Sequence, residues 1–208
     1  MLLTILSLLL SLWPINGVDK EFPKSRWLLG CSTGLTESLS KHDSSPLEGG
    51  RGVGDSLTVY IFLLNECVIS QYYTPLLTDF YKKYHDRKVG FIGYFPSFND
   101  KPEAIEAFGK KYKLDFPLKQ DYYKVWTKKM GATVTPEVAV WDHRSDRLIY
   151  RGRIDDSYVR VGKRKLHSQN HELKNIIDNW LLNVIPDTLV QTQAIGCFIS
   201  FNGPLDRE

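Results

Sequence analysis

The sequence has few cysteines, no excess of charge of one sign and no hydrophobic run of the length that a bilayer requires. Three cysteines among 208 residues are too few for a scaffold built on disulfides. Lys and Arg number 27 against 24 Asp and Glu, and the longest basic run covers only residues 163–165. Nucleic acid is therefore not an expected partner. With 42% hydrophobic and 25% charged residues, the composition is that of a globular protein and excludes disorder, collagen and multi-span membrane proteins.

The amino terminus carries the longest apolar run, which is rich in Leu and Ile over residues 2–12. Trp13 and Pro14 break the run, and the small residue Gly17 precedes a polar stretch. This pattern predicts a secretory signal peptide over residues 1–17, with a buried helix or a retained anchor as the alternatives. The protein is then expected outside the cytoplasm, in the periplasm or the medium, with no stable membrane insertion after the signal is removed.

Three further segments follow the predicted signal peptide. Residues 18–56 are dense in Ser and Gly and predict a flexible segment. Residues 57–185 hold the periodic apolar patterns of one folded domain, and residues 186–208 form a tail that contains Cys197. An odd number of cysteines in an exported chain leaves at least one thiol free or only transiently paired.

The apolar patterns of residues 57–185 alternate between strand and helix. Strands are expected over residues 57–64 and 89–95, helices over 69–84, from 102 to 112, over 121–131 and over 171–182, and a hairpin from strands 134–141 and 148–151. This order predicts an α/β fold in which a mixed central sheet is flanked by helices on both faces.

Cys67 stands just after the first expected strand and opens the first helix. Its sulfur is expected to meet unpaired N–H groups and the positive end of the helix dipole, which stabilise a thiolate over a thiol. A thiolate is the nucleophile of disulfide exchange and of peroxide reduction. The alternative is that Cys67 is a small buried apolar side chain.

Thr135 and Pro136 begin the third strand, where a proline removes a main-chain donor from the ladder. A helix-opening Cys67, Pro75 within that helix and a Thr-Pro strand entry together resemble the thioredoxin fold. The resemblance implies a cis-proline loop that lies against the active-site cysteine. It also implies that Thr135 and Pro136 bind substrate, because the loop leaves main-chain groups free to pair with an extended chain.

Four ordered segments, residues 65–73, 131–138, 150–156 and 194–197, resemble exported bacterial redoxins of the peroxiredoxin-like group, the alkyl hydroperoxide reductases and thiol-specific antioxidant proteins. The sequence departs from the motifs of these families in two places, and each departure limits the activity that the resemblance implies. Ser70 occupies the position of the second cysteine of Cys-X-X-Cys, which excludes a dithiol within one helical turn. Tyr60 and Leu64 occupy positions where peroxiredoxins carry their Pro and Thr, so the peroxide-binding constellation is absent.

The resemblance implies an exported thiol-disulfide oxidoreductase in which Cys67 attacks a protein or small-molecule disulfide and a second thiol releases the product. Cys197, 130 residues further along the chain, is the leading candidate for that thiol, and Cys31 or an external thiol reductant are the alternatives. A weak single-cysteine peroxidase and a binding module without catalysis remain alternative functions.

No cofactor or metal is expected. His167 and His171 are four residues apart, but without a second cysteine near Cys67 they are interpreted as solvated residues at a helix start. The sequence leaves the oligomeric state open.

Overall fold

The computed structural model describes residues 56–202. The predicted signal peptide of residues 1–17, the predicted flexible segment of residues 18–56 except its last residue, and Cys31 lie outside the described residues.

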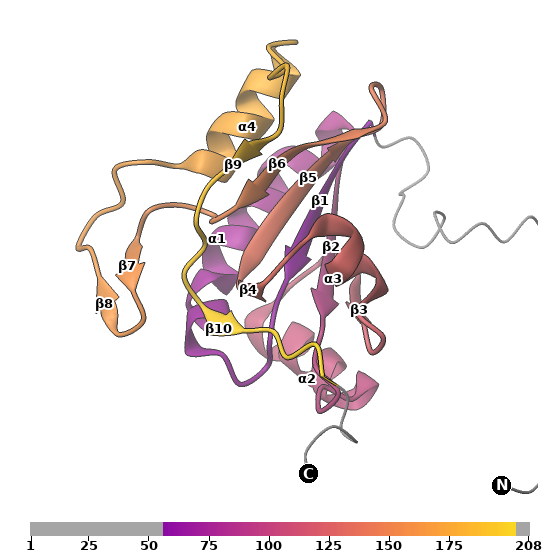
Figure 1. The fold of residues 1–208 in the computed structure, drawn as a ribbon, viewed down its shortest axis with the longest axis vertical. Coiled ribbons are helices and arrows are strands. Elements are labelled where there is room, and N and C mark those ends of the chain that lie inside the picture. The colour runs from indigo at the N-terminus through magenta and orange to yellow at the C-terminus, as the bar shows by residue number, and fades with distance from the viewer. Residues whose placement is uncertain (1–55, 203–208) are drawn as a thin grey trace, which may run out of the picture. The chain divides into compact units, whose positions relative to one another are not determined.

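The described chain is built around a six-stranded sheet with the strand order β3-β2-β1-β5-β6-β9 (Figure 1). In chain order the elements are β1 (Leu57–Phe62), α1 (Val68–Tyr84), the 3-10 helix η2 (His85–Arg87), β2 (Val89–Phe95), α2 (Pro102–Tyr112), β3 (Leu118–Gln120), α3 (Val125–Met130), β4 (Val134–Thr135), β5 (Glu137–Asp142), β6 (Arg147–Gly152), β7 (Tyr158–Arg160), β8 (Lys163–Arg164), α4 (Glu172–Leu181), β9 (Val190–Gln191) and β10 (Cys197–Phe198).

The sheet is mixed. β1 pairs parallel with β2 and antiparallel with β5, so that Val59 lies between Phe91 on one side and Val140 on the other. β5 and β6 form an antiparallel hairpin, and β3 and β9 add short parallel edge strands. Because β1 is central, it is buried along its whole length, as its continuous apolar run predicts.

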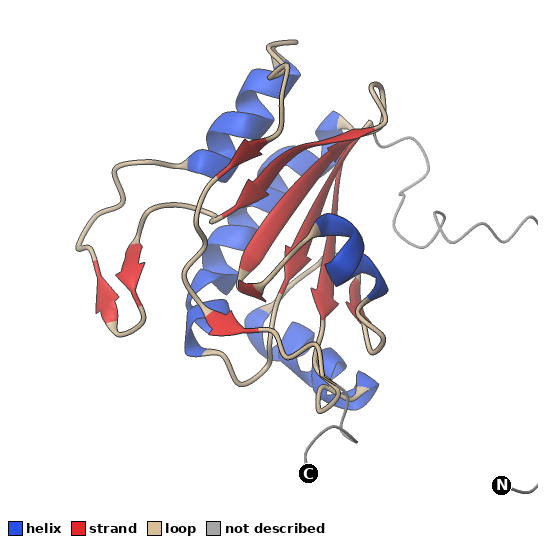
Figure 2. Ribbon diagram, viewed as in Figure 1, coloured by secondary structure: helices blue, strands red, loops and turns tan. Residues whose placement is uncertain are grey.

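Alternate residues of β1 face two hydrophobic cores on opposite sides of the sheet. Val59 and Ile61 pack in the larger core with residues of α1, α2 and α4. Tyr60 and Phe62 pack in the smaller core, where Met130 and Trp126 of α3 cover them. Figure 2 shows α3 in front of the sheet and α1 behind it. The predicted α/β fold, a mixed sheet with helices on both faces, is confirmed.

The order of β1, α1, β2, β5, β6 and α4, with β1 beside both β2 and β5, is that of a thioredoxin-like fold. The expected helices and the hairpin are present, and Pro75 lies inside α1 without interrupting it. The expected strand 134–141 is divided into β4 and β5 at Pro136. No helix within residues 56–202 is both long enough and apolar enough to cross a membrane.

The segment expected to be a tail is joined to the domain. β9 extends the sheet by pairing with β6, and β10 pairs with β4 in a separate two-stranded ladder. Ile199 is buried in the smaller core, and its N–H donates to the carbonyl oxygen of Thr133 at 3.0 Å. Residues 190–199 therefore return across the front of the domain to the start of α1, as the yellow trace in Figure 1 shows.

Candidate functional site

Cys67 is the residue immediately before α1, in extended backbone conformation. Its main-chain N–H donates to Leu64 and its carbonyl accepts from Gln71, so the turn from β1 into α1 holds the residue in place. The side chain is only 1% exposed, and Sγ lies 3.2 Å from the carbonyl oxygen of Thr135. The start of α1 and the end of β4, which are 68 residues apart in sequence, thus meet at this sulfur.

The Thr135–Pro136 peptide bond is cis and joins β4 to β5. The carboxylate of Glu137 organises the loop from within, because Oε2 accepts the N–H groups of Thr133 at 2.7 Å and Val134 at 3.3 Å. Arg151 on β6 lies 3.7 Å from the other carboxylate oxygen. Glu137 was not among the residues predicted from the sequence. The signal that could have identified it is an acidic residue beside a proline at the start of an otherwise apolar strand.

Cys197 reaches the same point from β10. Cys197 lies directly opposite Thr135 in the antiparallel pairing of β10 with β4, and the two sulfur atoms are 2.8 Å apart. Both cysteines are free thiols. The close approach requires glycine at position 196, where a Cβ atom would lie 2.0 Å from the carbonyl oxygen of Thr135.

The two thiols have opposite protonation preferences. Burial raises the pKa of Cys67, but a hydrogen bond from the Cys197 thiol and further ones from Ser70 and the Ile69 amide outweigh it, so the pKa of Cys67 lies below its ordinary value. Burial, the hydrogen bond to Cys67 and the charge of that thiolate raise the pKa of Cys197 to about 12. Cys67 is therefore the thiol of the pair that loses its proton more readily, and Cys197 S–H donates to its sulfur.

Ser70, in the place of the second cysteine of a Cys-X-X-Cys motif, has a part in this arrangement. Its side chain is fully buried and its hydroxyl accepts the N–H of Leu64 at 3.3 Å. The amide and hydroxyl of Ser70 also stabilise the Cys67 thiolate. The position that supplies a second thiol in a dithiol motif here supplies hydrogen bonds.

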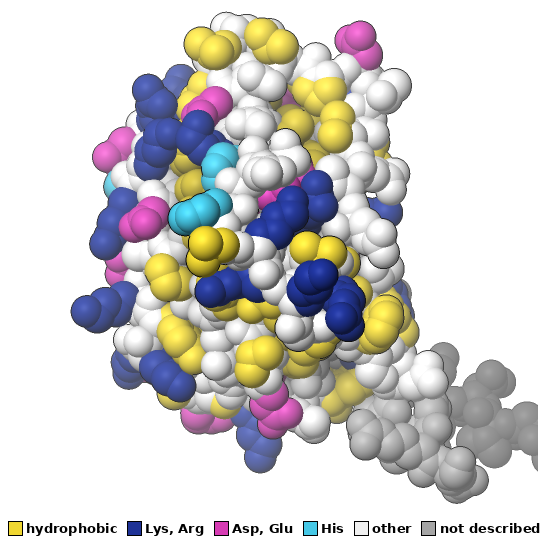
Figure 3. Space-filling view, turned by 90° about the vertical axis from the view of Figure 1, so that its left-hand side faces the viewer, with side chains coloured by type: hydrophobic (Ala, Val, Ile, Leu, Met, Phe, Trp, Pro, Cys, Tyr) yellow, Lys and Arg dark blue, Asp and Glu magenta, His cyan; other side chains and the backbone are white. Residues whose placement is uncertain are grey.

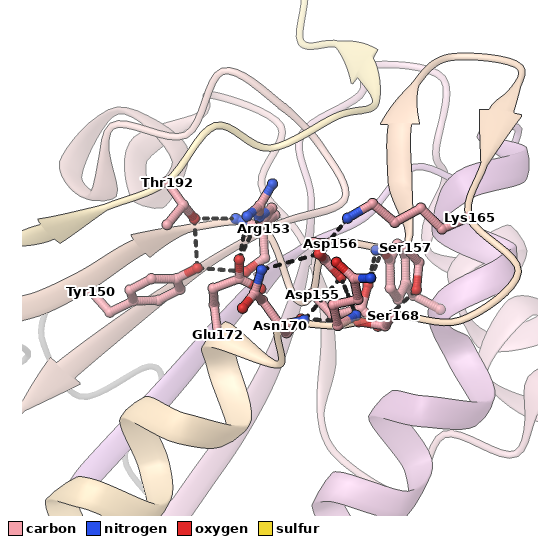
Figure 4. Close-up of polar contacts among 12 residues, drawn as sticks. Tyr150, Arg153, Asp155, Asp156, Ser157, Lys165, Ser168, Asn170, Glu172 and Thr192 are labelled. Atoms are coloured by element: carbon pink, nitrogen blue, oxygen red, sulfur yellow. Dashed lines mark hydrogen bonds and ion pairs between the residues drawn. The ribbon is translucent and has the colours of Figure 1, made fainter.

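A polar network behind the site ties α1, the β7–β8 hairpin and the start of the tail together (Figure 4). Tyr73 of α1 donates to Asp155 at 2.5 Å, and Arg153 pairs with Glu172 at the start of α4. The side chain of Asp156 accepts from Lys165, Ser168, Gln169 and Asn170. These carboxylates are occupied in holding loops.

Thr192 connects the same network to the tail. Its hydroxyl lies 2.7 Å from the hydroxyl of Tyr150 and accepts the N–H of Arg153 at 3.1 Å. Its own N–H donates to the carbonyl of Arg151. The tail is thus held at Thr192 and again at Cys197, on the two sides of residues 193–196.

Among residues 56–202, no three His, Cys, Asp or Glu side chains gather in a way that could hold a metal ion.

Solved structures share this fold. A conserved uncharacterised protein from Geobacillus kaustophilus matches with a TM-score of 0.61 and 21% identity, over 71% of this chain and 78% of that one. A hypothetical protein from Sinorhizobium meliloti 1021 matches with a TM-score of 0.60 and 24% identity, over 72% and 81%. Neither description states an activity, so these likenesses show the fold alone.

More distant neighbours include thiol-disulfide oxidoreductases. One is a secreted disulfide oxidoreductase of Mycobacterium tuberculosis homologous to Escherichia coli DsbE, with a TM-score of 0.38 and 19% identity, over 42% of this chain and 63% of that one. No protein-family model matches the sequence, and no curated protein matches it.

Proposed function

We propose that the protein is a thiol-disulfide oxidoreductase of the redoxin type, with Cys67 as nucleophile and Cys197 as resolving thiol. The observation that carries the proposal is the contact of the two sulfur atoms, 2.8 Å apart, across the pairing of β10 with β4 beside Pro136. A charged sulfur at a helix start and a protonated partner within bonding reach are what a two-step exchange requires.

In the first step the Cys67 thiolate attacks one sulfur of a substrate disulfide. A bond forms between Cys67 and that sulfur, the substrate S–S bond breaks, and the other substrate sulfur leaves as a thiolate that takes up a proton. Cys67 is then joined to the substrate in a mixed disulfide.

In the second step Cys197 loses its proton to solvent or to the departing thiolate and attacks the Cys67 sulfur. The Cys67–Cys197 disulfide forms, and the substrate leaves with a second thiol, so the substrate has gained two electrons and the protein has lost two. Once Cys67 is in a mixed disulfide its charge is gone. Burial continues to raise the pKa of Cys197, but the contribution from the Cys67 charge is removed at the point where Cys197 must react.

An external thiol reductant closes the cycle by reducing the Cys67–Cys197 disulfide, and the same steps in reverse would make the protein an oxidant of dithiols. Thr135 and Pro136 are proposed to guide the substrate. In the dithiol form described here β10 occupies the edge of β4 that an extended substrate would use. A substrate that pairs with this edge therefore displaces β10.

We extend the proposal to an exported protein that acts on protein or small-molecule thiols and disulfides. The amino-terminal pattern of residues 1–17 supports export.

The test follows the exchange reaction in three forms of the full chain. In a Cys31→Ser background only Cys67 and Cys197 remain, and this form should reduce a neutral model disulfide and acquire one intramolecular bridge. Cys67→Ser in that background should abolish the reaction. Cys197→Ser should retain the first step and accumulate the mixed disulfide, which intact-protein mass spectrometry detects.

Three results would contradict the proposal. Unchanged exchange in the Cys67→Ser form would exclude Cys67 as the nucleophile, and unreactive thiols in every form would favour a binding module. Rapid oxidation of Cys67 by hydrogen peroxide without any reaction with disulfides would favour the single-cysteine peroxidase.

A further inference from the structure

An open groove lies beside the cysteine pair, between the β7–β8 hairpin and the tail. Its volume is about 610 Å³. One wall is the run of residues 193–196, the other includes Arg160 and Val161 of the hairpin, and Arg151 and Glu137 lie at its base. Gly196 and Phe198 both line the groove, so it extends along the two neighbours of Cys197.

The groove and its rim are positively charged. Residues 157–167, which contain the hairpin, include four Lys or Arg and no Asp or Glu. Within the described part of the chain, Arg160 and Lys163 have no ion-pair partner, whereas Glu137 is buried and already accepts two N–H groups beside Arg151. Figure 3 shows Lys and Arg side chains gathered among hydrophobic ones on the face that bears the hairpin.

The wall formed by the tail offers main-chain groups. In residues 56–202 no main-chain hydrogen bond involves Gln193, Ala194, Ile195 or Gly196, although the residues on both sides of this run are bonded. Unpaired N–H and C=O groups along an accessible run are a site at which an extended peptide adds as a strand. Val161, 61% exposed, and Phe198, 88% exposed, supply apolar contacts beside it.

We propose that the Cys67–Cys197 pair exchanges the disulfide of a substrate protein, and that this groove binds an extended acidic segment of that substrate. The inference rests on the proposed function, which it deepens by naming the substrate class. Charge complementarity with Arg160 selects acidic side chains, and the unpaired run 193–196 selects a polypeptide rather than a nucleic acid.

Binding is tested with short fluorescent peptides that contain no cysteine, so that the result does not depend on exchange chemistry. One peptide alternates Val with Glu, and its matched control alternates Val with Lys. The full chain should bind the acidic peptide, more weakly as salt is added, and should not bind the basic one. Arg160→Glu should weaken binding by roughly fivefold or more, as expected for the loss of about 1 kcal/mol.

Arg87→Glu is the matched charge reversal, since Arg87 is exposed on η2 outside the groove, and it should leave the affinity unchanged. Equal binding of the acidic and basic peptides, or equal effects of Arg160→Glu and Arg87→Glu, would overturn the proposal. So would binding of a short single-stranded oligonucleotide as tight as that of the acidic peptide, which would assign the surface to nucleic acid.

A kinetic arm separates this inference from the proposed function. Arg160→Glu should raise KM for a disulfide placed within the acidic peptide and leave kcat unchanged, and it should not affect a small neutral disulfide. If exchange of the neutral disulfide is intact but the acidic peptide has no advantage, the groove proposal fails alone. If no disulfide reacts while the acidic peptide still binds, the proposed function fails and the binding site stands.

Discussion

The two cysteines belong to regions that are held in very different ways. Cys67 lies where β1 enters α1, surrounded by the larger core and by the buried Ser70, so its position is determined by the packing of the whole domain. Cys197 lies on a two-residue strand of the tail, which is held by its pairing with β4, by Ile199 and by Thr192. The proposed nucleophile is thus preorganised, and the proposed resolving thiol is on a segment that few interactions retain.

This difference suits the chemistry of a two-step exchange. A nucleophile works best when its charge is stabilised before the substrate arrives, which requires fixed donors. A resolving thiol must make room for the substrate in the first step and return in the second, which requires that its segment opens at low free-energy cost. The unbonded residues 193–196, between Thr192 and Cys197, allow such movement without disturbing the sheet.

The largest effect is expected from a variant that removes the Cys197 thiol, which donates a hydrogen bond to the Cys67 sulfur. In the Cys31→Ser background, Cys197→Ala removes the S–H group that donates to Cys67, so the pKa of Cys67 should rise toward its ordinary value. Each unit of that rise above the assay pH lowers the thiolate population about tenfold and the rate of the first step about threefold, because a more basic thiolate is a better nucleophile. The ultraviolet absorbance of the thiolate, followed against pH, measures the change.

Cys197→Ser is the matched control, because a hydroxyl can still donate to the thiolate. Its Cys67 pKa should stay below that of the Cys197→Ala form. Identical titration curves for the two variants would show that Cys67 is stabilised by Ser70 and Ile69 alone, and the two regions would then be electrostatically independent.

A second, smaller effect is expected from a substitution of Asp156, whose carboxylate holds the loop between β8 and α4. Asp156→Ala removes a buried carboxylate that accepts from Lys165, Gln169 and Asn170, and we expect a loss of about 3 kcal/mol in the free energy of unfolding. Urea unfolding measures this loss. The Cys67 titration should change little, because none of the groups that set the pKa of Cys67 is in this network.

The loss should also depend on pH. Burial alone would raise the pKa of Asp156, but the hydrogen bonds from Lys165, Asn170 and Ser168 hold it far below its ordinary value. A depressed pKa in the folded state stabilises the protein above the unfolded pKa of about 4, and this contribution disappears as the pH falls toward the folded pKa. The stability difference between the wild type and Asp156→Ala should therefore shrink in acid. A difference that is independent of pH would contradict this account.

The preorganised region could be predicted from sequence and the tail could not. The runs of residues 57–64 and 89–95 and the helical stripe after Cys67 are long enough for their periodicity to determine the element. The position of Cys67 between strand and helix followed from those patterns. Strands β9 and β10 have two residues each, which is too short for any period, and their pairing depends on partners that are distant in sequence.

Two local signals were available and were missed. Residues 159–161 alternate Val and Arg just before Gly162, whose φ of 78° suits a turn, and this stretch lies in the β7–β8 hairpin. Glu137 beside Pro136 indicated a carboxylate inside the site loop. The 2.8 Å contact of the two sulfur atoms had no local signal, because it is set by a tail that returns across the domain.

The smallest effect on the free energy of unfolding is expected from a variant that weakens the attachment of the tail. This variant distinguishes local opening of the tail from unfolding of the whole domain. Thr192→Val keeps the side-chain shape but removes the hydroxyl that accepts the N–H of Arg153 and contacts Tyr150. We expect a loss of only about 1 kcal/mol in the free energy of unfolding. Alkylation of Cys197 should nevertheless accelerate several-fold, because a weaker anchor raises the population of the open tail.

Gln193→Ala is the control one residue along, since the exposed Gln193 side chain makes no hydrogen bond within the described residues. It should change neither the stability nor the alkylation rate. If Thr192→Val lowers stability as much as Asp156→Ala does and leaves Cys197 protected, the tail opens only when the domain unfolds. Residues 190–199 would then be held as firmly as Cys67. Freeing the edge of β4 for a substrate would in that case require a partner that unfolds more of the domain than the tail.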